Sequence, residues 1–497
     1  CVEANTMYPI DNDMRLLTLN IQLVILAQTI TWYRSSDLQE PVLNYVLGKR
    51  SYSENVITGD NAPGQMHPRN RYRNSPPDFA VLAFKYSSFY PFVHYTKEGK
   101  PYIDFKNPEA VRELTYCLLR NDFNLTLSIP LDTLCPPIPN RYLRDLANSA
   151  NLKDLISTET KQDRSVYAID IGTGASCIYP LLGCTLNKNW MFLATEYAET
   201  NVLRNNLDHR ITVIHNKTDK KIMLSDEVLS NNSIKFAFCM CNPPFYESQE
   251  QYEKGVEIKH SPPLSVCTGA SHEKITVGGE FQFIKDILEE SLILRNKIRW
   301  YTSKIGRLET VNKIVRELKK NRIDNYVVTE FCQGQTRRWG IGWSFGTQRP
   351  SMSISHPSSK KLRKAAPPKS EFFVILSTNT DNLKEFLKKL FDQLEIGGQW
   401  NEDSYTFIGS ANINTWSRAA RRQKLMKTDC QIESSTIAST STDEFLFEFT
   451  CNIEPWNVSI NSTKVTFSWT NGKDRSVFEQ FYGHVKKKLE QEFSTDE

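Results

Sequence analysis

Between residues 164 and 346, short apolar runs alternate with stretches of helical periodicity, and this alternation limits the fold more than any other feature of the chain. The runs have the character of strands buried on both faces, and they lie at residues 166–171, 191–195 and 234–240. Apolar residues recur at helical spacing in residues 281–292 and 309–320. We therefore predict a mainly parallel α/β sheet with helices on both of its faces.

The residues before this region have a different pattern of apolar and polar residues. Residues 66–163 are mostly helical in pattern, and Asn107, Pro108 and Glu109 form the signature of a helix N-terminus. They supply a capping side chain, a proline at the first helical position and an acid in the first turn. We interpret residues 66–163 as an N-terminal helical module. Residues 1–65 form an N-terminal extension to which we assign no function.

The residues after it divide at a stretch that is rich in Ser, Pro and Lys. This stretch, residues 347–369, predicts a linker. Strand-like and helical runs share residues 370–497, which predicts a second, small α+β domain. Near Trp416, arginines recur at helical spacings that suit a track for RNA phosphates, at Arg418, Arg421 and Arg422. A helix face that is merely solvated would carry the same pattern.

The composition excludes several classes of protein. The 61 Lys and Arg residues against 57 Asp and Glu leave a net charge of +4, so any nucleic-acid surface must be local. The 11 cysteines are scattered, which is typical of buried thiols in a reducing compartment rather than of a disulfide framework. The longest apolar stretch, residues 16–32, contains Asn and Gln and is short for a membrane span. We predict neither a metal site nor a membrane segment.

A glycine-rich loop follows the first predicted strand. Asp170, Gly172, Gly174 and Ser176 lie between that strand and a helical stretch. Glycines there let the backbone approach a cofactor, and the helix N-terminus offers free N–H groups. The second predicted strand ends in Glu196, whose carboxylate can accept hydrogen bonds from both hydroxyls of a ribose. The pattern predicts a nucleotide-containing cofactor, and it fits a dehydrogenase as well as a methyltransferase.

The third predicted strand ends in Asn242-Pro243-Pro244-Phe245, which favours a methyltransferase. The side-chain oxygen of Asn242 and the carbonyl of Pro243 can together accept both protons of a planar amino group, and prolines restrict the backbone that holds them. Phe245 offers a face on which a base can stack. Holding both N–H bonds of an adenine amine favours a tetrahedral nitrogen whose lone pair can reach an electrophilic methyl group. A rigid strand-to-loop turn is the structural alternative.

Several motifs occur in order between residues 66 and 346: MHPRNRYR, PPDF, DIGTGASCIYPLLG, CMCNPPF and FCQGQTRRW. With them the chain resembles the adenine-N6 RNA methyltransferase family of methyltransferase-like protein 16, which acts on U6 small nuclear RNA. The resemblance implies a Rossmann-like class I methyltransferase domain at residues 164–346, with S-adenosylmethionine as the methyl donor. It also implies that the N-terminal module and the C-terminal domain, residues 370–497, bind RNA.

The resemblance assigns site residues by motif. Catalysis falls to Asn242, Pro243, Pro244 and Phe245. The donor-binding residues are Arg141, Asp170, Gly172, Gly174, Ser176, Glu196, Thr218 and Asn242. The RNA-binding residues are Arg69, Arg71, Pro76, Pro77, Asp78, Phe79, Lys217, Gln335, Arg337, Arg338, Arg418, Arg421 and Arg422. Directly after Glu196, the chain is about two helical turns shorter than the family pattern.

These features lead to one functional expectation and two alternatives. We expect methyl transfer to adenine N6 in a loop or bulge of a structured RNA hairpin, with U6 small nuclear RNA as the target and pre-mRNA hairpins as further candidates. One alternative is an RNA-binding regulator with weak or no catalysis. The other keeps the chemistry but acts on ribosomal RNA adenines or on protein glutamine amides. We expect a nuclear location, with the cytoplasm as an alternative, and the sequence leaves the oligomeric state open.

Overall fold

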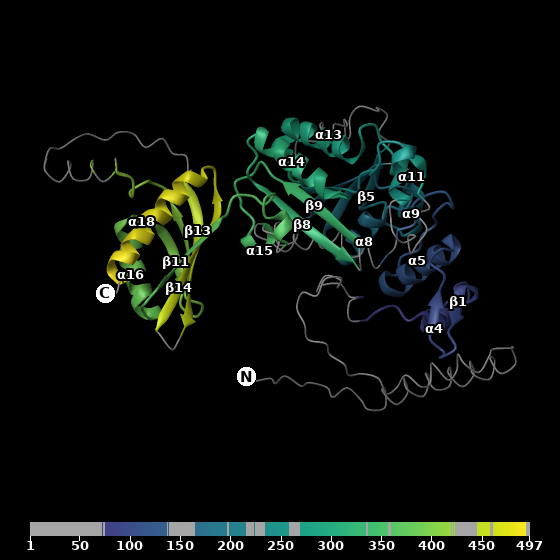
Figure 1. The fold of residues 1–497 in the computed structure, drawn as a ribbon, viewed down its shortest axis with the longest axis horizontal. Helices are drawn as coiled ribbons and strands as arrows, with labels where there is room; N and C mark the ends of the chain where they lie inside the picture. The colour runs from purple at the N-terminus through teal and green to yellow at the C-terminus, as the bar shows by residue number, and fades with distance from the viewer. Residues whose placement is uncertain are drawn as a thin grey trace, which may run out of the picture.

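The structure is a computed structural model that describes residues 72, 75–136, 138, 165–195, 198–214, 223, 234–257, 269–333, 336–355, 359–418, 420, 422, 445–457 and 461–493. Figure 1 shows three parts in chain order: N-terminal elements in purple and blue, a central sheet in teal and green, and a C-terminal sheet in green and yellow. No helix within these ranges is long and apolar enough to cross a lipid bilayer.

A seven-stranded sheet forms the centre, in the order β5-β4-β3-β6-β7-β9-β8. Its strands are β3 (Val166–Ile171), β4 (Trp190–Thr195), β5 (Ile211–Ile214), β6 (Phe236–Cys241), β7 (Ile298–Ile305), β8 (Tyr326–Gln333) and β9 (Thr336–Trp343). The strands from β5 to β7 pair in parallel, whereas β9 is antiparallel to both β7 and β8. The predicted, mainly parallel sheet is therefore confirmed, and its three predicted strands overlap β3, β4 and β6.

The strands are apolar on both faces because helices cover both faces. Phe238 of β6 packs in one core with α8 (Ile178–Leu186), whereas Cys239 packs in the other with α13 (Gly279–Leu294) and α14 (Leu308–Lys320). Adjacent strand residues point to opposite faces, so a fully apolar strand serves both cores. The two predicted helices are confirmed as α13 and α14. The other helices here are α9 (Glu199–Arg204), α11 (Gln249–Glu257), α12 (Ser271–Lys274) and the 3-10 turn η3 (Arg295–Lys297).

The N-terminal part shares a core with the central sheet. Leu119 and Phe123 of α5 (Pro108–Phe123) belong to the same buried cluster as Ala168 of β3 and Leu181 of α8. This part is therefore fixed to the face of the sheet that α8 covers.

The mostly helical pattern predicted for this part is only partly right. As predicted, α5 begins after Asn107, whose side-chain oxygen accepts a hydrogen bond from the Glu109 N–H at 2.9 Å. A β-hairpin interrupts the helices, because β-branched and aromatic residues favour strands and Gly99 takes a φ of +77° at its turn. The additional elements are α4 (Phe79–Lys85), η2 (Tyr90–Phe92), β1 (Val93–Tyr95) and β2 (Pro101–Ile103).

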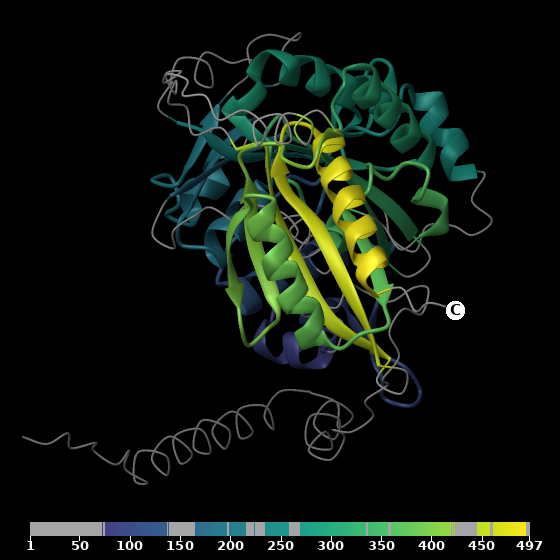
Figure 2. The ribbon, with the colours of Figure 1, turned by 90° about the vertical axis from the view of Figure 1, so that its left-hand side faces the viewer.

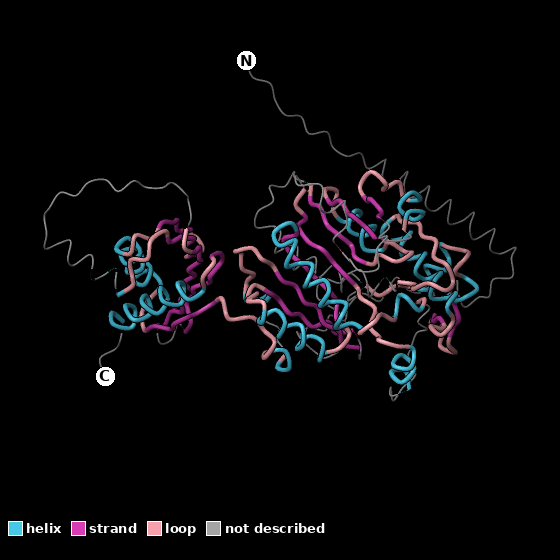
Figure 3. The backbone as a smooth tube through the Cα atoms, turned by 90° about the horizontal axis from the view of Figure 1, so that it is seen from above, coloured by secondary structure: helices cyan, strands magenta, loops and turns pink. Residues whose placement is uncertain are grey.

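The C-terminal part is an antiparallel sheet in the order β10-β14-β13-β12-β11. Its elements are β10 (Glu371–Leu376), α16 (Thr380–Gln393), β11 (Gly397–Asn401), β12 (Thr406–Ala411), β13 (Phe447–Asn457), β14 (Ser462–Gly472) and α18 (Arg475–Phe493). Figure 2 shows α16 and α18 side by side on one face of the sheet, over an aromatic core that includes Phe391, Phe449 and Phe481. Viewed from above, this part is a body of its own, joined to the larger one through loops (Figure 3).

Residues 347–369 connect the two sheets and pack against the central one. Leu362 is fully buried in the core that α13 and α14 form, and the Tyr326 hydroxyl donates a hydrogen bond to the Ala366 carbonyl at 3.1 Å. The connection holds α15 (Met352–Ser355) and the 3-10 turn η4 (Lys360–Leu362).

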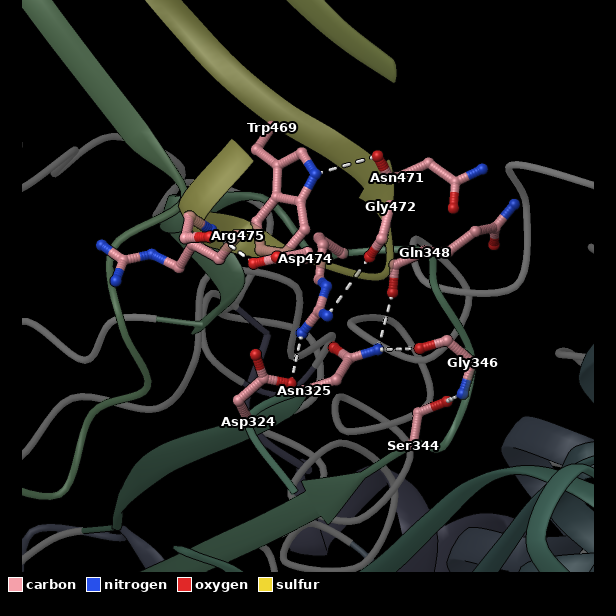
Figure 4. Close-up of polar contacts among 12 residues, drawn as sticks. Asp324, Asn325, Ser344, Gly346, Gln348, Trp469, Asn471, Gly472, Asp474 and Arg475 are labelled. Carbon is pink, nitrogen blue, oxygen red and sulfur yellow. Dashed lines mark hydrogen bonds and ion pairs between the residues drawn. The ribbon is translucent and has the colours of Figure 1, made fainter. Parts of the chain in front are cut away.

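Backbone pairing also joins the start of this connection to the C-terminal sheet. The Arg349 N–H donates to the Thr470 carbonyl at 2.7 Å, and the Gly472 N–H donates to the Thr347 carbonyl at 3.0 Å. Residues 347–349 thus lie beside the end of β14, where Gln348 forms an isolated antiparallel bridge with Asn471. Figure 4 shows the side chains that converge at this junction from both parts of the molecule.

Candidate active site

The glycine loop and the NPPF motif meet at one edge of the central sheet. β3 pairs in parallel with β4 on one side and with β6 on the other, so the carboxyl ends of all three strands lie next to one another. The strand order reverses between β3 and β6. Open α/β sheets bind their ligands at this reversal point, beyond the carboxyl ends of the strands.

The loop after β3 takes a backbone conformation that favours glycine. Gly172 and Gly174 have φ angles of +66° and +61°. A hydrogen bond of 2.6 Å from the Thr173 hydroxyl to the buried carboxylate of Asp170 holds the turn. A Cβ atom at Gly174 would lie 3.3 Å from Oε1 of Glu273, so the loop has little room for a side chain there. The loop therefore presents backbone to the site.

Asn242 carries the clearest sign of a missing ligand. Its Oδ1 is buried, and it accepts no hydrogen bond from any part of the chain that the structure describes. Leaving a buried acceptor unsatisfied costs about 1–3 kcal/mol. The end of β6 is fixed nearby, because the Thr302 hydroxyl donates to the Cys239 carbonyl at 2.7 Å. A rigid, unsatisfied acceptor is suited to a ligand that brings an N–H or O–H group.

The ring of Phe245 lies between two cations and a glycine. Lys304 Nζ is 5.6 Å from the ring centre and the Arg338 guanidinium carbon is 6.0 Å away. A Cβ at Gly306 would come within 2.8 Å of the ring, so this glycine lets the turn after β7 pack against it. Cations near an aromatic face also suit the phosphate that accompanies a stacked base.

A buried carboxylate supports this arrangement from behind. Glu280 is 3% exposed, and its Oε1 accepts a hydrogen bond from the Gly306 N–H. Burial raises the pKa of Glu280, and hydrogen bonds from Gly306, Thr310 and Arg307 act to lower it. Burial lowers the pKa of Arg338, while Tyr246 and Glu280 act to raise it. When it is ionised, Glu280 thus favours the charged form of the guanidinium that faces Phe245.

The structure brings together the predicted donor and catalytic residues that it describes. They lie in the glycine loop and at the end of β6, and they are Asp170, Gly172, Gly174, Ser176, Asn242, Pro243, Pro244 and Phe245. Several predicted site residues lie outside the described ranges, namely Arg69, Arg71, Arg141, Glu196, Lys217, Thr218, Gln335 and Arg421.

Two of the predicted RNA-binding arginines are adjacent on β9 and differ in their surroundings. Arg338 faces Phe245, whereas Arg337 is exposed and pairs with Glu330 at 3.4 Å. Adjacent strand residues point to opposite faces, which separates the two side chains. The structure therefore places Arg338 alone of this pair at the candidate site.

The predicted PPDF segment begins a helix. Asp78 caps α4, because its side chain accepts hydrogen bonds from the N–H groups of Ala80 and Val81. Phe79 packs edge to face on Phe89, with ring centres 6.2 Å apart. The two prolines before the cap, which restrict the chain that enters the helix, are Pro76 and Pro77. These residues therefore have structural roles. If they also bind RNA, they must do so in addition to those roles.

Trp416, near which the predicted arginine track lies, is a core residue of the C-terminal part. Trp416 is 2% exposed, and its ring lies 5.6 Å from that of Phe447 and 5.2 Å from that of Phe481. A large aromatic side chain gains more from burial in a core than from exposure. Arg418 and Arg422, in contrast, are exposed.

Sequence reasoning missed the residues that the end of β7 and the start of α13 bring to the site. Glu280, Lys304 and Gly306 belong to no motif. Lys304 and Gly306 reach Phe245 because β7 pairs with β6, and Glu280 of α13 contacts Gly306. No sequence signal singles out Glu280, because α13 carries other acids such as Glu289 and Glu290. The described ranges contain no group of three His, Cys, Asp or Glu side chains placed to hold a metal ion.

Comparisons with known proteins bear on this site. A family described as RNA methyltransferase matches residues 61–347. RNA N(6)-adenosine-methyltransferase METTL16 of Mus musculus is 42% identical over 325 residues, which make up 63% of this chain and 57% of the mouse protein. The chain therefore spans little more than half the length of that relative.

Two further similarities cover more of the matched protein. U6 small nuclear RNA (adenine-(43)-N(6))-methyltransferase of Schizosaccharomyces pombe is 33% identical over 410 residues, 79% of this chain and 96% of the yeast protein. The hMettl16 catalytic domain, solved in complex with MAT2A 3'UTR hairpin 1, is 42% identical with a TM-score of 0.53, and the match covers 60% of this chain and 100% of that one.

Proposed function

The chain belongs to the RNA methyltransferase family that matches residues 61–347, and from this premise we propose that it methylates adenine N6 in a structured RNA, with S-adenosylmethionine as the donor. The observation that carries the proposal is the buried, unsatisfied Oδ1 of Asn242 at the end of β6. An exocyclic adenine amine would bring the N–H that this acceptor lacks. The names of the mouse and yeast relatives describe the same reaction.

The residues of the chain act by holding the amine rather than by exchanging a proton. Asn242 and the carbonyl of Pro243 accept its two N–H bonds, which draws the nitrogen toward a tetrahedral geometry and directs its lone pair away from the ring. Phe245 stacks on the base, and Lys304 and Arg338 lie near that ring to meet its phosphate. Proline at both positions after Asn242 keeps these acceptors from moving.

The glycine loop fits the donor. Its positive φ angles at Gly172 and Gly174 bring backbone close to the site, and α8 directs its N-terminus toward the same edge of the sheet. When bound, S-adenosylmethionine supplies an electrophilic methyl group. By family resemblance Arg141, Glu196 and Thr218 complete its binding site.

A folded RNA with an unpaired adenosine is the substrate that this chemistry requires. An A-form duplex hides its base edges, so the target must come from a loop, bulge or end that can enter the site. We take a hairpin of U6 small nuclear RNA as the target, because the yeast relative bears that name, and pre-mRNA hairpins as further candidates, because the related catalytic domain was solved with a hairpin of the MAT2A 3'UTR. Because U6 is a small nuclear RNA, we propose that the protein acts in the nucleus.

The C-terminal part is proposed as a second RNA-binding surface. Arg418 and Arg422 are exposed on it, and α18 adds a run of lysines, Lys486, Lys487 and Lys488. Such cations bind phosphates without reading sequence. This surface would add affinity for the body of the RNA, while the central sheet selects the adenosine.

The test is methyl transfer from labelled donor to a U6-like hairpin by the full chain, with the modified nucleoside mapped by mass spectrometry. Asn242→Ala should abolish the product while RNA affinity stays within about twofold, because one acceptor adds little to a phosphate-dominated interface. Exposed Asn382→Ala on α16 is the matched control and should leave turnover unchanged. RNA binding without product in the unmodified chain would favour a regulator with little catalysis, and product on protein alone would overturn the proposal.

A further inference from the structure

An extended segment of the N-terminal part lies against α9 without belonging to any strand. Leu125, Leu127 and Ile129 are buried in the core, and the residues between them point outward. This is the alternation of a strand, and a buried strand must pair its backbone N–H and C=O groups. Here side chains supply the partners that a neighbouring strand would supply.

Two asparagines, Asn201 in α9 and Asn205 at its C-cap, act as that missing strand. Asn205 accepts a hydrogen bond from the Thr126 N–H at 2.8 Å and donates to the Thr126 carbonyl at 2.8 Å. Asn201 does the same for Ser128, at 2.8 and 2.9 Å. Four helical residues rise about 6 Å and two strand residues about 6.6 Å, so amides one helical turn apart match alternate residues of the segment.

The two asparagines differ in where the second amide proton goes. Asn201 donates it to the carbonyl of Ala175, in the glycine loop, at 2.7 Å. Asn205 donates it to the carbonyl of Asn201, one turn back in its own helix, at 2.7 Å. Asn201 is 2% exposed, so its amide holds the extended segment and the glycine loop together without competition from water.

We propose that Asn201 is a positioning residue for the methyl donor, which it serves by fixing the backbone of the glycine loop at Ala175. The proposal rests on the proposed function, because it assumes that the loop binds S-adenosylmethionine. Ala175 lies between Gly174 and Ser176, so its carbonyl sets the direction of the adjoining peptide groups. A loop whose glycines leave the backbone free needs such an external restraint to keep one conformation.

The chain offers a matched pair of variants. Asn201→Asp and Asn205→Asp each keep the accepting oxygen and replace the donating amide by a carboxylate oxygen, which repels the carbonyl it faces. Both damage the contact with the extended segment in the same way and add the same charge. Asn201→Asp alone disturbs the Ala175 carbonyl.

The experiment measures the affinity for S-adenosylmethionine by titration calorimetry on the full chain without RNA, together with the melting temperature. We expect a loss of melting temperature in both variants, larger at the more buried Asn201, but a donor affinity about tenfold weaker only in Asn201→Asp, as for the loss of one hydrogen bond in a buried site. Asn201→Ser and Asn205→Ser, which remove the amide without adding charge, repeat the comparison if the Asp variants do not fold.

The outcomes separate the two proposals. If the unmodified chain binds no donor, the proposed function fails. If it binds donor and the Asn201 variants bind as tightly as the Asn205 variants, Asn201 only supports the fold and the positioning role is overturned. A selective loss in the Asn201 variants supports that role.

Discussion

The guanidinium carbon of Arg349 lies 4.3 Å from the centre of the Trp469 ring, which places an arginine that follows the central sheet on the core of the C-terminal one. The same guanidinium donates to Asp324 at 2.9 Å and to the Gly472 carbonyl at 3.3 Å. The Arg349 side chain is 8% exposed. One buried cation thus contacts both halves of the molecule, and the surrounding residues in Figure 4 come from both.

Arg349→Ala should loosen the junction between the two sheets. Removing a buried cation that pairs with Asp324 and stacks on Trp469 should lower the free energy of unfolding of the junction by about 2–4 kcal/mol. Differential scanning calorimetry should then separate the unfolding transitions of the two parts. Arg363→Ala, at an exposed arginine of the same connection, should leave the trace unchanged. An unaltered trace for Arg349→Ala would show that backbone pairing alone holds the junction.

Arg338→Ala should reduce kcat/KM for the RNA by about tenfold or more, because it removes a half-buried cation beside Phe245, the ring that we propose stacks on the base. Arg337→Ala, one residue earlier on β9, should stay within about threefold, because that side chain is exposed and paired with Glu330. Steady-state kinetics on a hairpin substrate measure both, and donor affinity should change in neither variant. Equal losses of kcat/KM in the two variants would mean that both arginines bind phosphate. They would also mean that the base does not stack on Phe245.

Glu280→Gln should remove a pH-dependent loss of stability. Burial raises the pKa of Glu280 above its ordinary value of 4.5, so between that value and the folded-state pKa the folded chain retains a proton that the unfolded chain has released. The free energy of unfolding of the native protein therefore falls as pH rises through this window. Glutamine keeps the oxygen that Gly306 needs and cannot ionise, so the variant should gain stability relative to the native protein as pH rises.

Thermal unfolding of both proteins from pH 4 to pH 8 measures this difference. Glu289→Gln, at an exposed carboxylate of the same helix, is the control. Its stability relative to the native protein should not increase as pH rises. If the difference in free energy of unfolding between Glu280→Gln and the native protein stayed constant across that pH range, Glu280 would not titrate in the window.

The sheet and the two motifs could be predicted because their signals are local. Central parallel strands are apolar on both faces, so β3, β4 and β6 can be predicted from their apolar runs. The glycine loop and NPPF follow those strands directly, and parallel pairing then brings the motifs to one edge. Neither inference needs long-range information beyond the strand order.

The rest depends on contacts between residues far apart in the chain. Asn201 and Asn205 looked like ordinary polar residues of a short helix, and only the fold places Ser128 and Thr126 opposite them. The sequence likewise does not show that the Trp416 ring fills the core beside Phe481. Patterns of residue type do not say which partner a side chain will meet.

The burial of Leu362 bears on how such a protein could arise by joining gene segments. The composition changes at about residue 346, yet Leu362, well beyond that point, is 0% exposed in the core of the central sheet. Recombination at the compositional border would remove this buried side chain from the core of the central sheet, at a cost comparable to a large-to-small core substitution, about 2–5 kcal/mol. The two halves are therefore expected to be inherited together, or to exchange only at a breakpoint that leaves Leu362 with the central sheet.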